Sequence, residues 1–324
     1  MATESVGPSV ASAPPLTAEG RRKLARGAGG KSSGGRRNNT LTAYLFLLPY
    51  LFVLCVFLLF VAVYGVGLSF FKVDIGFSAP QFIGFRNYQA LFNQLTNPGL
   101  SDFWVSMANI LKFVVAVVIG QTILALVLAM VLQNTLIAKG FFRTVLYVPA
   151  VTSSVATSLI FLWLYNPDGL INYVLSLVHL NGPDWLNDPF FALPALMLLN
   201  IWSTAASFMI YFLAALQDLP REVLEAAQVD GANRLQIFWF VTAPLLRPTI
   251  FLVVALGTIG SFQMFDQAKF MTNGGPYNST LTPMLQIYNT AFGDSKFGLA
   301  AAMSVLLFII IFAVTLVQRR LIED

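Results

Sequence analysis

Long apolar runs separated by short polar segments dominate the pattern of this chain. Each run holds roughly 20 or more mostly apolar residues, the length that a helix needs to cross about 30 Å of hydrocarbon. Inside a bilayer the backbone must satisfy its own hydrogen bonds, so runs this long and uniform are expected to be helices. The pattern predicts an all-α polytopic membrane protein with six transmembrane helices, at residues 43–71, 103–132, 145–165, 190–216, 244–265 and 297–317.

The first 40 residues have a different composition, rich in Gly, Ser, Ala and Pro and poor in large apolar side chains. Such a segment buries too little surface to offset its ordering entropy, which predicts a disordered basic tail at 1–40 and a membrane domain at 41–324. Gly30, Lys31 and Ser32 resemble the end of a phosphate-binding loop. Ala25 stands where that motif requires its first glycine, so we expect no nucleotide site there.

Composition and charge agree with a membrane protein. Of the 324 residues, 57% are hydrophobic and 10% are charged, whereas soluble proteins carry about 25% charged residues. The single cysteine, Cys55, and the single histidine, His179, exclude a disulfide framework and a multi-thiolate or multi-imidazole metal site. With the N-terminus inside, the inner segments hold 14 of the 19 Lys and Arg residues and the outer segments hold 5. This imbalance predicts that both termini are cytoplasmic.

The polar segment 220–248, between the fourth and fifth apolar runs, is more elaborate than a connection needs to be. Pro220 suits a first helical position, and two glutamates follow in the first turns, where they complement the helix dipole. Gly231 is a good helix stop, and Asn233 can cap a second helix over 234–242. The segment therefore predicts a helix–turn–helix on the cytoplasmic side, where it would serve as a docking surface.

This segment also resembles the coupling loop of ABC importer permeases. That pattern runs Glu-Ala-Ala, three residues, Gly, nine residues and Ile-x-Leu-Pro, and it is matched here by Glu225, Ala226, Ala227, Gly231 and Pro244. The closing residues depart from it, since they read Val-Thr-Ala-Pro over 241–244. Three further stretches, at 165–172, 272–276 and 297–302, resemble landmarks of the maltose-permease-like sugar permeases. The resemblance covers about residues 42–320.

The resemblance implies a type I ABC importer permease with a cytoplasmic coupling helix in the loop 217–243, in a bacterial inner membrane. Such a subunit forms half of the pathway for a sugar or oligosaccharide that an external solute-binding protein delivers. Its expected partners are a second homologous permease, membrane lipid and two ATP-binding subunits. Those subunits carry ATP and Mg, and this chain carries no cofactor and binds no nucleic acid. Coupling to the ATPase is expected of Glu225, Ala226, Ala227, Asp230, Gly231 and Pro244.

Two other functions stay open at this point. One is import of glycerol-phosphate or a related polyol, which the same subgroup includes. The other is an ATP-independent secondary transporter, which would need ionisable residues deep in several spans. Only Lys112 and Asp266 approach that depth, and both lie near span ends. No Ser–His–Asp set or paired carboxylates lie in the spans, so we expect a transport subunit and not an enzyme.

Polar residues at membrane depth are the remaining candidates, because they are costly in hydrocarbon and tend to line a pathway. The expected substrate-pathway residues are Asn200, Ser203, Gln263 and Asp266. Asn200 and Gln263 fit a pathway role and a packing role equally well. Most Ser and Thr hydroxyls in the spans are expected to bond to the backbone of their own helix or to mediate helix packing. Three aromatic candidates for stacking on a sugar are Trp163, Trp202 and Tyr211, although aromatic residues also anchor helices at membrane interfaces.

Overall fold

A computed structural model describes residues 35–73, 79–93, 102–134 and 139–323. By its internal contacts the chain divides into two units, residues 1–62 and 63–324. The remainder of the predicted tail, residues 1–34, lies outside the described residues, and the first helix begins at Gly35.

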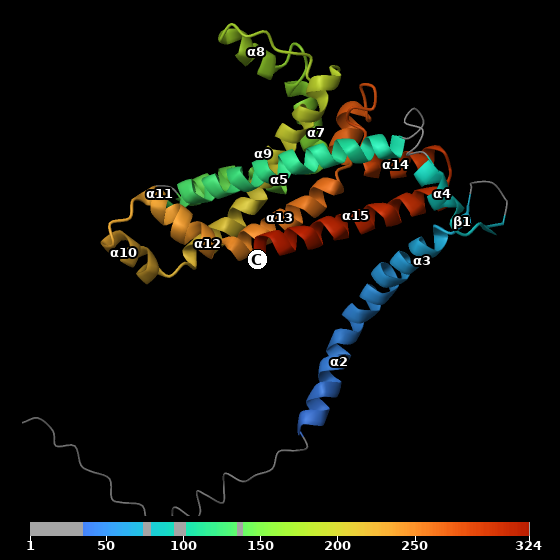
Figure 1. Cartoon of the computed structure of the whole chain (residues 1–324), viewed down its shortest axis with the longest axis horizontal. Coiled ribbons are helices and arrows are strands. Elements are labelled where there is room, and N and C mark those ends of the chain that lie inside the picture. Colours follow the sequence, from blue (N-terminus) through green and yellow to red (C-terminus); the bar gives the residue numbers. More distant parts are fainter. Residues whose placement is uncertain (1–34, 74–78, 94–101, 135–138, 324) are drawn as a thin grey trace, which may run out of the picture. The chain divides into compact units, whose positions relative to one another are not determined.

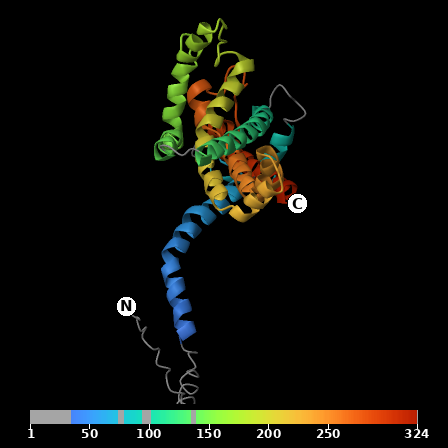
Figure 2. The ribbon, with the colours of Figure 1, turned by 90° about the vertical axis from the view of Figure 1, so that its left-hand side faces the viewer.

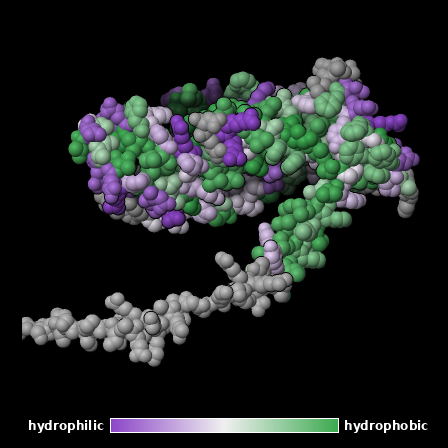
Figure 3. Space-filling view, turned by 60° about the horizontal axis from the view of Figure 1, so that its bottom comes forward, coloured by the Kyte–Doolittle hydropathy of each residue, from purple (hydrophilic) through white to green (hydrophobic). Residues whose placement is uncertain are grey.

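The first unit contains one long apolar helix. It is built from α2 (Gly35–Val53), a π-helical turn η1 (Leu54–Leu59) and the beginning of α3 (Phe60–Leu68). Residues Thr42–Leu68 form a helical segment of 27 residues whose side chains are exposed, and its surface is hydrophobic (Figure 3). This segment corresponds to the first predicted span. Its exposed apolar surface is the surface that lipid or another subunit would cover.

Four helices form the body of the second unit: α5 (Asp102–Asn134), α9 (Pro189–Gln217), α13 (Arg247–Phe262) and α15 (Phe297–Glu323). They pack side by side along α5 and α13 (Figures 1 and 2). One buried cluster surrounds Phe113, Leu199 and Phe262, and a second surrounds Phe212 and Leu246. The buried apolar faces of these helices therefore form a core of two clusters.

A polar contact joins three of these helices inside the core. The Thr204 hydroxyl donates to the buried Gln121 Oε1 at 2.6 Å, which connects α9 to α5. On α13, Gly257 leaves the space that the Gln121 amide occupies, because a Cβ there would lie 1.9 Å from Gln121 Nε2. The absence of a side chain at Gly257 is thus what allows α13 to approach α5 at this point.

The chain bends sharply within the third predicted span and at the beginning of the fifth. α6 (Lys139–Val151) and α7 (Ser154–Leu164) meet at 96°, and the helical segment Arg234–Leu245 meets α13 at 68°. The described residues thus contain four helices that are long and apolar enough to span a membrane, or up to six if each bent pair is one span. Proline explains both breaks: Pro149 removes a helical hydrogen bond near the end of α6, and Pro248 has no N–H to donate back across the second bend.

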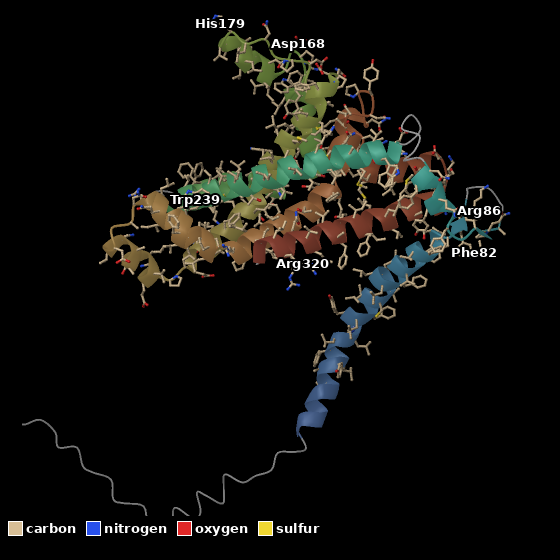
Figure 4. The ribbon with its side chains drawn as sticks, viewed as in Figure 1. Phe82, Arg86, Asp168, His179, Trp239 and Arg320 are labelled. Carbon is tan, nitrogen blue, oxygen red and sulfur yellow. The ribbon has the colours of Figure 1, made fainter. Side chains whose placement is uncertain are left out.

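Short elements occupy the two ends of the second unit (Figures 1 and 4). The end that holds Trp239, called the hairpin end here, consists of α10 (Arg221–Val229), α11 (Arg234–Ile237), the π-helical turn η3 (Phe238–Thr242) and α12 (Ala243–Leu245). The opposite end, which holds Arg86, contains β1 (Phe71–Lys72), β2 (Gln81–Phe82), α4 (Arg86–Asn93), η4 (Ala268–Thr272), α14 (Pro283–Tyr288) and η5 (Asn289–Gly293). The strands pair antiparallel, Phe71 opposite Phe82. α8 (Leu170–Leu177) follows α7 and carries Asp168 and His179 near its ends.

Candidate functional site

The α10–α11 hairpin forms as the sequence predicts. α10 begins at Arg221, with Pro220 at the N-cap and not in the first turn, and it ends at the C-cap residue Asp230. Gly231 follows with a φ of +81°, a conformation that glycine adopts without a steric penalty. Asn233 then caps α11 through two reciprocal bonds: its side chain accepts from the Gln236 N–H at 2.9 Å, and Gln236 Oε1 accepts from the Asn233 N–H at 2.8 Å. This capping box confirms the predicted helix–turn–helix.

The predicted coupling residues lie mainly on the exposed surface of this hairpin. Glu225, Ala226 and Asp230 are exposed and Ala227 is half-buried, while Pro244 lies separately on α12. Within the described residues Glu225 forms no ion pair and no side-chain hydrogen bond, so its carboxylate is available to a partner.

Large apolar side chains at this end of the unit are also exposed, which the hydrophobic pattern of the sequence does not reveal. Val229 is 87% exposed, Phe240 79% and Trp239 62%. Trp239 projects at the hairpin end of the bundle (Figure 4). Charged residues and exposed aromatic rings together form a surface typical of protein–protein interfaces, where aromatic residues are enriched.

A polar cavity of about 180 Å³ lies where the third span is broken. It is bounded by the end of α6, the beginning of α7, the middle of α9 and the segment after α13. Its polar lining consists of hydroxyl and amide side chains: Thr152, Ser154, Thr157, Asn200, Ser203, Thr204, Ser207 and Gln267. The structure thus brings two of the predicted pathway residues, Asn200 and Ser203, into one cavity.

Several of these hydroxyls are already committed as donors. Thr152 donates to the Val148 carbonyl at 2.9 Å, and Ser203 donates to the Asn200 carbonyl at 3.1 Å. The Thr204 hydroxyl, which has one proton, lies 2.6 Å from both the Asn200 carbonyl and Gln121 Oε1. This agrees with the backbone bonding expected for Ser and Thr in membrane helices. Their oxygens still present lone pairs, so these hydroxyls offer the cavity acceptors, whereas the Asn200 and Gln267 amides can also donate.

Asp266 lies at the rim of this polar cavity. Its carboxylate accepts a hydrogen bond from the hydroxyl of Ser154, the first residue of α7, and Ser154 itself lines the cavity. The side chain of Ser153, the N-cap residue of α7, makes no cap bond. A negative charge near the first turn of a helix is stabilised by the free N–H groups and the helix dipole. Asp266 therefore connects the broken third span to the segment that follows α13.

Residues 121–323 match the protein family described as the binding-protein-dependent transport system inner membrane component. The chain belongs to this family. The probable ABC transporter permease protein YesP of Bacillus subtilis is 33% identical over 291 residues, which are 89% of this chain and 92% of YesP. The lactose transport system permease protein LacF of Rhizobium radiobacter is 33% identical over 289 residues, 87% of this chain and 94% of LacF.

A solved structure shares the fold. One chain of a bacterial alginate ABC transporter, in complex with its alginate pentasaccharide-bound periplasmic protein, superposes with a TM-score of 0.73 at 22% identity, covering 87% of this chain and 94% of that chain. Family and fold together confirm the predicted all-α, multi-pass ABC importer permease, a transport subunit and not an enzyme. Among the described residues no group of three or more His, Cys, Asp and Glu side chains could hold a metal ion.

The permease places the remaining candidates outside the polar cavity. Gln263 is exposed and lines a separate groove of about 460 Å³ between α13, α14 and α15, with Met284 and Phe308. Trp163, Trp202 and Tyr211 are exposed and do not line the cavity. The sequence pattern does not single out Gln267, because only the fold brings it next to Asn200.

The permease forms a tight turn at 272–276, one of the stretches that resemble landmarks of the sugar permeases. Asn273 and Gly274 have positive φ angles of 49° and 87°, and the Thr280 hydroxyl donates to the Gly275 carbonyl at 2.6 Å. Asn109 of α5 holds the following residues, because its amide donates to the Asn278 carbonyl at 2.7 Å. Asn109 is thus a structural tie and lies apart from the polar cavity.

Proposed function

We propose that this permease forms half of the membrane pathway of an ATP-driven importer for a sugar or oligosaccharide. The observation that carries the proposal is the polar cavity at the break between α6 and α7, lined by hydroxyl and amide groups. Such groups match the hydroxyls of a sugar, since each can exchange hydrogen bonds with them in a site that is otherwise surrounded by apolar helices. The name of the similar lactose permease supports the same class of solute.

The chemistry of this cavity favours a sugar over glycerol-phosphate. A phosphate group is normally bound by Arg, Lys or clustered N–H groups. The residues that line the cavity include no Arg, Lys or His among the described part of the chain. An ATP-independent carrier is not supported either, because YesP, which matches this chain over nearly its whole length, is named as a probable permease of an ABC transporter.

The proposed assembly contains this chain, a second homologous permease, two ATP-binding subunits and an external solute-binding protein. ATP and Mg bind to the ATP-binding subunits and not to this chain. The complex lies in the bacterial inner membrane with both termini of this chain, and the α10–α11 hairpin, in the cytoplasm. The alginate transporter supports the external partner, because its structure includes a periplasmic protein.

The geometry offers a mechanical route from ATP to the cavity. Closure of the ATP-binding subunits displaces the α10–α11 hairpin, on which Glu225, Ala226, Ala227, Asp230 and Gly231 form the contact surface. The helical segment Arg234–Leu245 continues from the hairpin and meets α13 at a 68° bend. The far end of α13 leads directly to Asp266 and Gln267 beside the cavity. A shift of the hairpin therefore moves one wall of the cavity. Pro244 restricts the backbone of the helical segment that connects the hairpin to α13.

The experiment that tests this function is uptake into proteoliposomes. The permease is expressed with its partner permease and ATP-binding subunits, and the purified complex is supplied with the binding protein and labelled oligosaccharides. Uptake should require internal ATP and should fall when Asn200 is replaced by Ala. Uptake that proceeds without ATP, or a permease that assembles with no ATP-binding subunit, would contradict the proposal.

A further inference from the structure

The polar cavity has an unbalanced charge. Asp266 is the acidic group at its rim, joined to the cavity through the hydroxyl of Ser154. The nearest basic residue along the same segment, Lys269, is directed elsewhere: its ammonium donates to Asn273 Oδ1 at 3.0 Å and lies 5.3 Å from the centre of the Tyr288 ring. Neither Asn273 nor Tyr288 lines the cavity. A solute in the cavity would therefore meet one carboxylate and no lining cation within the described residues.

The surroundings of Asp266 make this charge effective over the width of the cavity. Asp266 is half-buried and its contact with Ser154 is exposed to solvent, so the effective dielectric constant is about 20, the value typical of charge pairs near a protein surface. Two unit charges about 7 Å apart in such a site interact strongly enough to change a binding constant by about tenfold or more. The cavity has a volume of only about 180 Å³, so a bound group cannot move far from this carboxylate.

We infer that Asp266 is a specificity-determining residue that makes the cavity select neutral, polyhydroxylated solutes and reject anionic ones such as uronic acids and sugar phosphates. The inference rests on the proposed function in one respect, namely that this cavity is part of the solute pathway. The Asp266 carboxylate supplies the charge, and the hydroxyl and amide lining supplies the hydrogen bonds to the neutral solute. Charge exclusion and hydrogen bonding are then separate properties of the same cavity.

Thiol modification measures this charge directly and requires no knowledge of the natural solute. The single native cysteine is replaced (Cys55→Ser), and a reporter is introduced in the cavity (Ser203→Cys). The assembled complex is treated with two methanethiosulfonate reagents of similar size, the cationic ethylammonium and the anionic ethylsulfonate, and the ratio of their rates is determined. A reporter on exposed α8 (Ser176→Cys) gives the reference ratio away from the cavity.

The cation-to-anion ratio should be about tenfold higher at the cavity reporter than at the α8 reporter. Asp266→Asn should remove most of this preference at the cavity and leave the α8 ratio unchanged. Ser154→Ala keeps the carboxylate and should keep the preference, and so should Asp266→Glu if Asp266→Asn fails to assemble. Equal ratios at the two reporters, or a cavity ratio that Asp266→Asn does not alter, would overturn the inference.

This outcome is separable from the proposed function. If the complex imports no sugar but the cavity ratio depends on Asp266, the charge preference stands and the proposed sugar pathway does not. If sugar import is confirmed and the ratio is flat, only the role of Asp266 fails.

Discussion

Replacement of Gly231 tests the coupling surface through the left-handed backbone conformation of the turn between α10 and α11. Gly231 has a φ of +81°, and a Cβ built on it would meet nothing within 4 Å. Within this chain a Cβ at position 231 therefore adds no clash, so the effect on the turn itself comes from the left-handed backbone, and contacts with an ATP-binding subunit would add to it. That conformation costs a non-glycine residue about 1–2 kcal/mol, more for a β-branched residue and less for Asn.

The expected free-energy cost at the turn between α10 and α11 is thus about 1 kcal/mol for Gly231→Ala, about 2 kcal/mol or more for Gly231→Val and the least for Gly231→Asn. A cost of 2 kcal/mol lowers the population of the native turn relative to its alternatives by about thirtyfold, because 1.4 kcal/mol is a factor of 10. Coupling should fall in the order Gly, Asn, Ala, Val. The global fold should be retained, because the turn lies at the surface.

The assay is ATP hydrolysis and solute uptake by the reconstituted complex, with and without loaded binding protein. Gly293→Ala is the matched control, since Gly293 lies at the opposite end of the unit, has an ordinary φ and also leaves open space around a Cβ. Thermal unfolding of each complex shows whether assembly is intact. If Gly231→Val couples as well as the unaltered complex, or if Gly293→Ala is impaired to the same degree, the reasoning about the turn is refuted.

Three further predictions follow from individual contacts. Asn233→Ala removes both bonds of the capping box and should destabilise α11 by about 1 kcal/mol, lowering stimulated ATP hydrolysis, whereas Asn233→Asp should retain most of it. Gly257→Ala places a Cβ against Gln121 Nε2 and should lower the Tm of the complex by several degrees. Adding Gln121→Ala to the same chain should recover part of this loss. Gly260→Ala, where a Cβ has open space, should have little effect on the Tm. Asn200→Ala should reduce uptake without loss of assembly, and Thr315→Ala, which removes a polar side chain of α15 outside the polar cavity, serves as its control.

The sequence predicted the features that depend on local chemistry. The helix stop at Gly231 and the cap at Asn233 follow from residue type and spacing, and the structure forms both. Local signals of this kind are reliable because the backbone groups that they satisfy belong to the same few residues.

Features that depend on tertiary packing could not be predicted in this way. Pro149 and Pro248 are visible in the sequence, but proline within an apolar run permits either a kink or a full break, and only packing decides which. Gln263 and Gln267 lie one helical turn apart in sequence and line different hollows, because the helix ends at Gln263 and the chain changes direction before Gln267. The hydrophobic pattern therefore identified polar residues within the apolar spans, but it did not show which of them line the polar cavity and which line the groove.

The two bends in the chain have different relations to the polar cavity. The break between α6 and α7 frees backbone groups at membrane depth, and such groups are tolerated where they line a cavity that contains polar partners. The hydroxyl and amide lining supplies those partners, and the Asp266–Ser154 contact secures the beginning of α7. The second break, between Leu245 and Arg247, allows α13 to change its angle to the segment that carries the coupling surface. One break thus lies at the polar cavity, and in the proposed mechanism the other is the joint through which the α10–α11 hairpin acts on it. A variant that straightens the second bend should therefore uncouple ATP hydrolysis from transport while leaving the cavity intact.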